Sequence, residues 1–203
     1  MLKVGITGGI GVGKTYISNI LEKMGYPVFY SDIIAKEIMS KDSRLISLIK
    51  QEFGDDIYLA DNKIDNKLLS SIVFNDNNRL SKLNSLIHPF VFECFNEWCD
   101  NQLSSIIFKE AAILFESNSH LNLDKVICIT ASKKTRIQRI IKRDNRSEEE
   151  IRKIISRQME QTEKVKLSDY VVENDGDKSI LLQISDILEK LEEEVFNDKE
   201  QDC

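Results

Sequence analysis

The sequence contains no long apolar run and no paired cysteine motif. None of its hydrophobic stretches reaches the length of a membrane span, and 41% hydrophobic with 31% charged residues is the balance of a soluble globular protein. Its cysteines form no C-x-x-C pair, which argues against a zinc site and a disulfide framework: Cys94, Cys99, Cys128 and Cys203. We therefore expect reduced thiols, a cytoplasmic location and no signal or transit peptide.

An excess of positive charge is missing as well. The net charge of −6 argues against a general nucleic-acid binder, and 203 residues suffice for one α/β core with a small inserted subdomain. The basic residues are nevertheless concentrated in residues 133–157, where ten lysines and arginines stand against four acidic residues. A local basic stretch of this kind suits a small polyphosphate ligand.

Glycine is scarce outside one cluster near the start of the chain. Residues 8–15 read GGIGVGKT and fit G-x-x-x-x-G-K-[ST], a phosphate-binding loop or P-loop. In this motif backbone N–H groups surround phosphates, so that Lys14 would reach the β- and γ-phosphates and the Thr15 hydroxyl would coordinate Mg²⁺. The flanking pattern predicts a strand over 2–7 and a helix over 16–24, which is the context that the motif needs.

Strands alternate with helices along most of the chain. The apolar pattern predicts further strands over 26–30, 105–108, 125–130 and 170–173, and further helices over 33–39, 133–143, 147–161 and 178–196. This order predicts an α/β fold, a P-loop NTPase-type doubly wound parallel sheet. Residues 43–100 are mostly helical by periodicity, with breaks at 54–66 and at His88-Pro89, and predict a helical insertion; residues 197–203 are expected to be frayed.

Four polar residues directly follow predicted strands, where ligands of open parallel sheets bind: Asp32, Glu110, Thr130 and Asn174. If its strand lies beside strand 2–7, the Asp32 carboxylate shares an edge with the P-loop and can accept a proton from an attacking hydroxyl. The same position also suits a helix N-cap, and spacing leaves both interpretations open. Glu110 suits either a magnesium-bound water or a cap or surface charge.

Three arginines recur at helical spacing within the basic segment. Arg136, Arg139 and Arg143 fall on one helical face, and Ile137, Ile140 and Ile141 are expected to face inward. A polar break over 144–147 and a capping box from Ser147 to Glu150 follow. The pattern favours a hinged basic lid that closes over the γ-phosphate, and a solvated basic face is the alternative.

Two further features are weaker candidates. Asn62-Lys63-Ile64-Asp65 spells the guanine-reading N-K-x-D motif, but it lies in a polar stretch, and the chain has no D-x-x-G switch, so guanine specificity is unsupported. His88 suits a hydrogen-bonded residue at a helix end better than a catalytic base.

Taken together, these residues resemble the dephospho-coenzyme A kinase family from about Val4 to Leu188. The similar segments, in order, are GITGGIGVGKT, SDIIAKEI, KIDNKLLSSIVFNDNNRLSKLNSLIHPFV, ILFES, TRIQRIIKRDNRSEEEIRKIISRQ and LSDYVVENDG. The chain departs from the family pattern at three positions: Tyr16 replaces the second hydroxyl of G-K-S-T, Ala112 a common proline, and Asn66 a frequent arginine.

The resemblance implies a reaction and a set of site residues. It implies ATP-dependent phosphorylation of the ribose 3′-hydroxyl of dephospho-coenzyme A. The implied roles are Asp32 as the base; Gly11, Val12, Gly13, Lys14, Thr15 and Tyr16 on the ATP phosphates; Arg139 and Arg143 on phosphates; and Asn174 with Gly176 near adenine. Asp32 and His88 would contact the acceptor, and Lys14 and Arg139 would join Asp32 in catalysis.

The implied organisation is a single kinase domain. Its core is expected over about 1–32 and 101–196, with an acceptor-binding helical insertion over about 33–100 and a lid over about 139–161. We expect ATP and Mg²⁺ as cofactors, no nucleic-acid or membrane partner, and favour a monomer. Another small-metabolite or nucleoside kinase is one alternative; a P-loop ATPase or switch is another, and it would not need Asp32 beside an acceptor hydroxyl.

Overall fold

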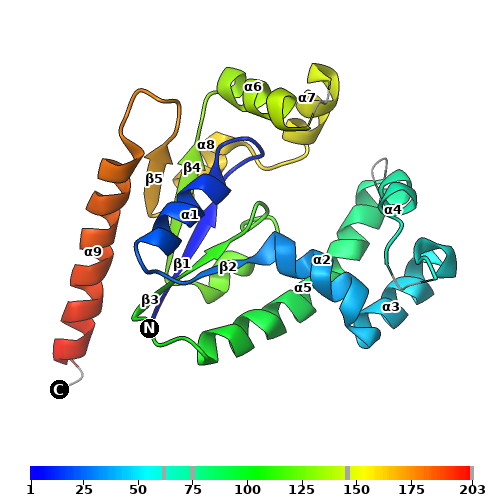
Figure 1. Ribbon diagram of the computed structural model, residues 1–203, viewed down its shortest axis with the longest axis horizontal. Helices are drawn as coiled ribbons and strands as arrows, with labels where there is room; N and C mark the ends of the chain where they lie inside the picture. Colours follow the sequence, from blue (N-terminus) through cyan, green and yellow to red (C-terminus); the bar gives the residue numbers. More distant parts are fainter. Residues whose placement is uncertain (61–62, 74–75, 145–146, 202–203) are drawn as a thin grey trace. The chain divides into compact units, whose positions relative to one another are not determined.

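The computed structural model describes residues 1–60, 63–73, 76–144 and 147–201 (Figure 1). The chain divides into two compact units, one of Met1–Phe29 with Gln102–Cys203 and one of Tyr30–Asn101. Part of the predicted polar break at 144–147 lies outside the described residues, as do Asn62 of the N-K-x-D stretch and Cys203. Among the described residues, no helix combines the length and apolar character needed to cross a membrane.

A five-stranded sheet forms the centre of the first unit, in the order β2-β3-β1-β4-β5. The strands are β1 (Leu2–Thr7), β2 (Val28–Tyr30), β3 (Ile106–Glu110), β4 (Lys125–Thr130) and β5 (Tyr170–Glu173). β1 pairs in parallel with β3 and β4, and β4 pairs in parallel with β5. The predicted doubly wound parallel sheet is therefore confirmed.

The position of β2 corrects one expectation. β2 lies beside β3, so it is not the neighbour of β1 from which the role of Asp32 was argued. All five residues of β3 are buried, whereas β2 has three residues and its last one is only half-buried. The fully buried strand takes the inner place, as is usual in parallel sheets, and the short strand takes the edge.

In the described part of the chain, the helices that accompany this sheet are α1 (Lys14–Lys23), α6 (Lys133–Asp144), α7 (Glu148–Ser156), α8 (Gln161–Lys166) and α9 (Ile180–Gln201), with a 3₁₀ turn at Ser119–Asn122. The predicted helix over 147–161 ends early, since α7 stops at Ser156 and the separate helix α8 starts only at Gln161. Between the two helices, Gln158 and Met159 bond to Ile10 and Glu116 of the core. The predicted capping box is confirmed, since Ser147 and Glu150 bond reciprocally at the start of α7. α9 continues to Gln201, beyond the predicted end at 196.

α9 lies alongside β5, the other edge of the sheet (Figure 1). The Gln183 side chain accepts from the Glu173 N–H at 2.8 Å and donates to the Glu173 carbonyl oxygen at 3.0 Å. An ion pair of 3.0 Å joins Lys125 of β4 to Glu194, and the Tyr26 hydroxyl donates to Glu192. α9 is thus fixed to the sheet at several points along its length.

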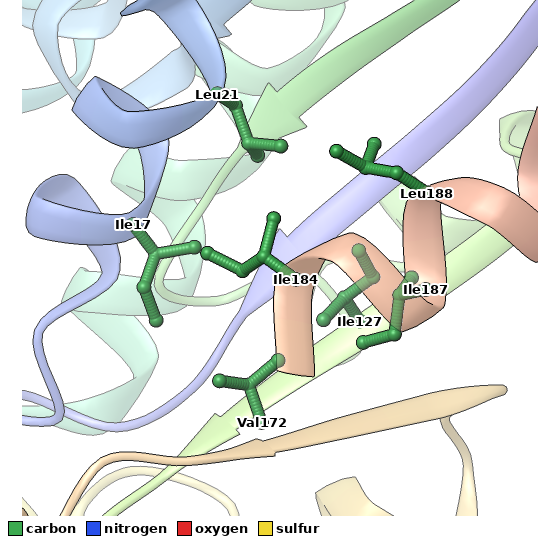
Figure 2. Close-up of a pocket in the computed structure, with 7 residues that line it drawn as sticks. All are labelled: Ile17, Leu21, Ile127, Val172, Ile184, Ile187 and Leu188. Atoms are coloured by element: carbon green, nitrogen blue, oxygen red, sulfur yellow. The ribbon is translucent and has the colours of Figure 1, made fainter. Parts of the chain in front are cut away.

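A small apolar cavity of about 10 Å³ remains beneath α9 (Figure 2). Its walls come from α1, β4, β5 and α9: Ile17, Leu21, Ile127, Val172, Ile184, Ile187 and Leu188. Figure 2 shows Ile17 and Leu21 directed from α1 toward Ile184. A void this small and wholly apolar is a packing defect and offers no polar partner to a ligand.

The second unit is helical, with α2 (Ser31–Lys41), α3 (Ser43–Phe53), α4 (Asn66–Val73), α5 (Asn77–Asp100) and a 3₁₀ turn at Asp55–Ile57. α5 runs through Pro89, so the predicted break at His88-Pro89 is wrong. Its buried residues Leu83, Ile87, Val91 and Phe95 recur every four residues on both sides of the proline. This continuous apolar stripe outweighs the local effect of proline.

The polar stretch before α4 has a structural role. Tyr58 and Ile64 form an antiparallel bridge, and Asp65 Oδ1 accepts from the backbone N–H groups of Lys67 and Leu68 at 2.9 and 3.1 Å. The aspartate of the N-K-x-D stretch therefore caps α4.

Candidate active site

The P-loop joins the end of β1 to the start of α1, and its conformation depends on glycine. Gly8 and Gly13 have φ angles of 147° and 96°, which other residues rarely adopt. A Cβ at Gly8 would lie 2.4 Å from the Ile129 carbonyl oxygen, and one at Gly13 would lie 2.4 Å from Asn174 Nδ2. The glycines therefore allow the surrounding protein to approach the loop closely from one side.

That side is lined by donors to the carbonyl groups of the loop. Arg136 Nε donates to the Ile10 carbonyl oxygen at 2.9 Å, and the Val12 carbonyl oxygen accepts from Arg139 Nη1 at 3.2 Å and Asn174 Nδ2 at 2.8 Å. The C=O and N–H of one trans peptide point in opposite directions. Holding these carbonyls therefore directs the N–H groups of Gly11 and Gly13 to the opposite side, where an anion can bind.

Lys14 and Thr15 occupy the first turn of α1, where the helix dipole favours negative charge. The Lys14 ammonium group donates to the Gly8 carbonyl oxygen at 3.1 Å, so its charge is folded back along the loop. Tyr16, the next residue, is 60% exposed. The structure thus places the cation and the hydroxyl of the motif together at the positive end of one helix.

Thr15 also meets the end of β3. Its hydroxyl donates to Glu110 Oε2 at 3.4 Å, and Glu110 is 7% exposed, which excludes the surface-charge interpretation. A hydroxyl and a carboxylate are the oxygen ligands that Mg²⁺ prefers, and Mg²⁺ commonly completes its shell with water and phosphate oxygens. In the part of the chain that the structure describes, no group of three or more His, Cys, Asp or Glu that could hold a metal ion is found.

The basic helix α6 turns two of its three arginines toward the P-loop. Arg136 is 6% exposed, and desolvation lowers its pKa; its guanidinium lies so close to Gly9 that a Cβ there would be 2.3 Å from Nη2. Arg139 Nη2 also donates to the carbonyl and side-chain oxygens of Asn174 at 2.9 and 3.1 Å. The interpretation of this helix as a solvated basic face is therefore wrong for Arg136 and Arg139.

The third arginine and one isoleucine of α6 differ from expectation. Arg143 is exposed and pairs with Asp144 at 2.6 Å, which raises the pKa of the arginine. Ile141 is 42% exposed, so its predicted inward orientation is wrong. Ile137 and Ile140 instead form the buried face of α6, against Ile151 of α7.

Asn174 connects the end of β5 to the P-loop. It is 7% exposed, its amide donates to Val12 and accepts from Arg139, and its backbone N–H donates to the Thr130 carbonyl oxygen. Asp175 accepts from the Ser132 N–H at 2.9 Å, and this bond lowers the pKa of the carboxyl. The loop from Asn174 to Gly176 is thus bound to both the P-loop and the start of α6.

Other contacts around the site carry no signal in the sequence. Gln158, between α7 and α8, accepts from the Ile10 N–H at 2.8 Å. Lys164 of α8 is fully buried and pairs with Glu116 at 2.8 Å. Gln158 lies near the end of the predicted helix over 147–161 and Lys164 lies in the polar stretch after it, and only their long-range partners show what they do.

Asp32 and His88 belong to the other unit, Tyr30–Asn101. Asp32 is exposed in the first turn of α2, whose N-cap is Tyr30, so the helix-cap interpretation of Asp32 is wrong. His88 is half-buried in the middle of α5. The structure therefore brings Arg139 and Asn174 to the loop that carries Lys14 and Thr15. Arg143 pairs with Asp144 instead, and the roles of Asp32 and His88 stay predictions.

Comparison with known proteins identifies the family. Residues 2–179 match the family model described as dephospho-CoA kinase. A dephospho-CoA kinase from Chlorobium chlorochromatii is 36% identical over 90% of this chain and 89% of its own length. The crystal structure of TT1252 from Thermus thermophilus has a TM-score of 0.81 at 28% identity, covering 94% of this chain and 97% of that one.

A second solved structure agrees with these matches. The dephospho-CoA kinase from Campylobacter jejuni has a TM-score of 0.64 at 26% identity, over 97% of this chain and 98% of its own. These likenesses extend over nearly the whole chain and include the P-loop, the basic helix and the loop after β5. The chain therefore belongs to the dephospho-CoA kinase family.

Proposed function

We propose that the chain transfers the γ-phosphoryl group of ATP to the ribose 3′-hydroxyl of dephospho-coenzyme A, giving coenzyme A and ADP. The observation that carries the proposal is a P-loop whose carbonyls are held by Arg136, Arg139 and Asn174 in a chain of this family. Phosphoryl transfer depends chiefly on positioning and charge stabilisation, which such a loop provides.

ATP would bind along the P-loop and the first turn of α1. The backbone N–H groups over Gly11–Tyr16 would donate to phosphate oxygens, and the Lys14 ammonium group would leave the Gly8 carbonyl for the β- and γ-phosphates. Thr15 would coordinate Mg²⁺ directly, and Glu110 would hold a water of its shell. Bound with ATP, Mg²⁺ neutralises phosphate charge.

Asp32 would act as the base on the acceptor. Its carboxylate is exposed and does not cap α2, so it is available to a hydroxyl. As the 3′-oxygen bonds to the γ-phosphorus, Asp32 would take the hydroxyl proton, and the bond from the γ-phosphorus to the ADP oxygen would break. Residues 33–100 would form the acceptor-binding part of the chain, with His88 among its contacts.

Residues 139–161 would form a lid over the phosphates. Arg139 is already beside Val12, and Arg143 pairs with its chain neighbour Asp144, an exposed pair that contributes little. On closure Arg143 would exchange this carboxylate for a phosphate, and both arginines would stabilise charge on the transferring group. Asn174 and Gly176 would border adenine. A cytoplasmic monomer fits this proposal.

A coupled ADP-release assay tests the reaction. ATP and Mg²⁺ are supplied with dephospho-coenzyme A, with a panel of nucleosides, or with no acceptor, and the product is identified by mass. We expect ADP release that depends on dephospho-coenzyme A and a product heavier by one phosphoryl group. Release with a nucleoside instead would indicate another small-molecule kinase, and release without any acceptor would indicate an ATPase.

A further inference from the structure

The peptide groups on both sides of Ile10 are held by side chains from one helical segment. The Ile10 N–H donates to Gln158 Oε1 at 2.8 Å, and the Ile10 carbonyl oxygen accepts from Arg136 Nε at 2.9 Å. Arg136 lies near the start of α6, and Gln158 lies two residues beyond the end of α7. The two ends of the α6–α7 segment therefore meet at a single residue of the P-loop.

The Ile10 side chain completes the apolar core of the same segment. It packs against the cluster formed by Ile137 and Ile140 of α6 and Ile151 of α7. These three residues are at most 7% exposed, and Ile151 is fully buried. Ile10 is therefore held in two ways. Its backbone forms hydrogen bonds with Arg136 of α6 and with Gln158 just beyond α7, and its side chain packs against apolar residues of α6 and α7.

The residues after Gln158 are anchored elsewhere in the core. The Met159 N–H donates to Glu116 Oε1 at 3.0 Å, and the buried Lys164 ammonium group donates to the Ala112 carbonyl oxygen at 2.8 Å. These contacts tie the segment to the residues after β3 and leave the Gln158 side chain directed at the P-loop. The chain that follows Gln158 is thus anchored to the core, and this anchoring allows the Gln158 side chain to hold Ile10 in place.

The P-loop needs such support because its glycines impose little conformational preference of their own. Gly8, Gly11 and Gly13 all have positive φ angles, and Ile10 is the first residue of the loop with a side chain. The orientation of its two peptide groups sets the directions of the Gly9 carbonyl and the Gly11 N–H. The Gly9 carbonyl oxygen in turn accepts from the Val12 N–H at 3.4 Å.

We propose that Gln158 is a positioning residue for phosphoryl transfer, which acts by holding the Ile10 peptide in the orientation that presents the loop to ATP. Together with Arg136 it couples the α6–α7 segment to the P-loop, so that a movement of the segment changes the phosphate site. The inference rests on the proposed function for its catalytic consequence, whereas the hydrogen bond itself does not depend on the acceptor.

Gln158→Met tests the role, because methionine keeps the length of the side chain and removes the acceptor. Gln183→Met is the matched control: its amide also accepts a backbone N–H at 2.8 Å, from Glu173, but does not touch the P-loop. We expect Gln158→Met to lower kcat/KM for ATP about tenfold, and Gln183→Met to leave it within about twofold. Similar kinetics for the two variants would overturn the proposal.

Amide exchange measured by NMR gives a second readout that does not need turnover. Gln158→Met should speed exchange of the Ile10 amide about tenfold and leave the Glu173 amide unchanged, and Gln183→Met should do the reverse. Calorimetry with ATP should show weaker binding only for Gln158→Met. Unchanged Ile10 exchange or unchanged ATP affinity would count against Gln158, whereas a wild-type chain inactive on dephospho-coenzyme A would count only against the proposed function.

A double-variant cycle examines the partnership with Arg136. If Gln158 and Arg136 act on the same residue, the loss of kcat/KM in the Gln158→Met, Arg136→Met double variant should be smaller than the product of the two single losses. Independent, multiplicative losses would show that the two side chains do not act through the Ile10 peptide.

Discussion

The ammonium group of Lys164 lies 2.8 Å from a carboxylate oxygen of Glu116. The lysine side chain is not exposed to solvent, whereas the glutamate side chain is 24% exposed. The pair joins α8 to the segment after β3, and Glu116 also accepts the Met159 N–H. The two partners are therefore unequal, because only the lysine depends wholly on the other for compensation of its charge.

This inequality predicts unequal effects of removing either partner. Glu116→Gln should lower the free energy of unfolding by about 3 kcal/mol or more, since it leaves a buried ammonium group without a counter-charge. Lys164→Met should lower it by less, because the remaining carboxylate can reach water. Urea unfolding at pH 7 measures both, and a larger loss for Lys164→Met would contradict the assignment.

Asn174→Ala should affect both stability and ATP binding. It removes a donor to the Val12 carbonyl and an acceptor for Arg139, so we expect a loss of about 1–3 kcal/mol in the free energy of unfolding. KM for ATP should rise more than KM for the acceptor. Asn101→Ala, which removes an exposed bond to the Glu97 carbonyl at a helix end, serves as the control. Equal effects on both KM values would argue against a role at the P-loop.

Asp32→Asn should slow turnover about a hundredfold or more and change ATP affinity little. The amide keeps the size of the side chain and cannot accept the proton. Steady-state kinetics with varied ATP and varied acceptor measures both quantities, with Glu37→Gln on the same helix as the control. An unaltered kcat would remove Asp32 as the base.

Lys14→Ala should lower kcat about a hundredfold or more through lost stabilisation of charge on the transferring phosphoryl group. Lys23→Ala, in the last turn of the same helix, should retain activity. Circular dichroism would verify that the overall helix content is unchanged in both variants. Near-normal turnover in Lys14→Ala would count against the whole phosphate-binding interpretation.

The raised pKa of Tyr26 predicts a loss of folding stability at alkaline pH. Burial, together with the hydrogen bond to Glu192 and its charge, raises the pKa of Tyr26 from 10.0 to about 12. Between these values the unfolded chain has lost the proton that the folded chain retains, so stability falls as pH rises from 10 to 12. The stability difference between wild type and Tyr26→Phe should be constant below pH 10 and shrink above it. Urea unfolding over this range measures the difference, and a pH-independent value would contradict it.

The local features of this fold follow from the sequence because their causes are local. The strand 125–130 and the capping box at Ser147 depend on neighbouring residues, and both are present in the structure. The P-loop motif likewise placed Lys14 and Thr15 at a helix start beneath a glycine loop. Patterns of this kind are complete within a few residues, so they can be read before the fold is known.

The contacts that hold the loop could not be predicted in this way. Gln158 and Asn174 act on residues 148 and 162 positions away, and nothing in their own segments marks the partner. The place of β2 was missed for a related reason, because strand order depends on competition among all strands for the buried positions. Pro89 shows the same effect, since the packing of Ile87 and Val91 overrides a local signal.

The bond between Gln183 and Glu173 also bears on how the molecule behaves at high concentration. β5 is an edge strand of four residues, and unpaired N–H and C=O groups on such an edge are a template for aggregation by strand addition. Gln183 takes up both groups of Glu173, and the buried Ile184, Ile187 and Leu188 keep α9 against the sheet. The helix thereby protects the edge from edge-to-edge association with other chains.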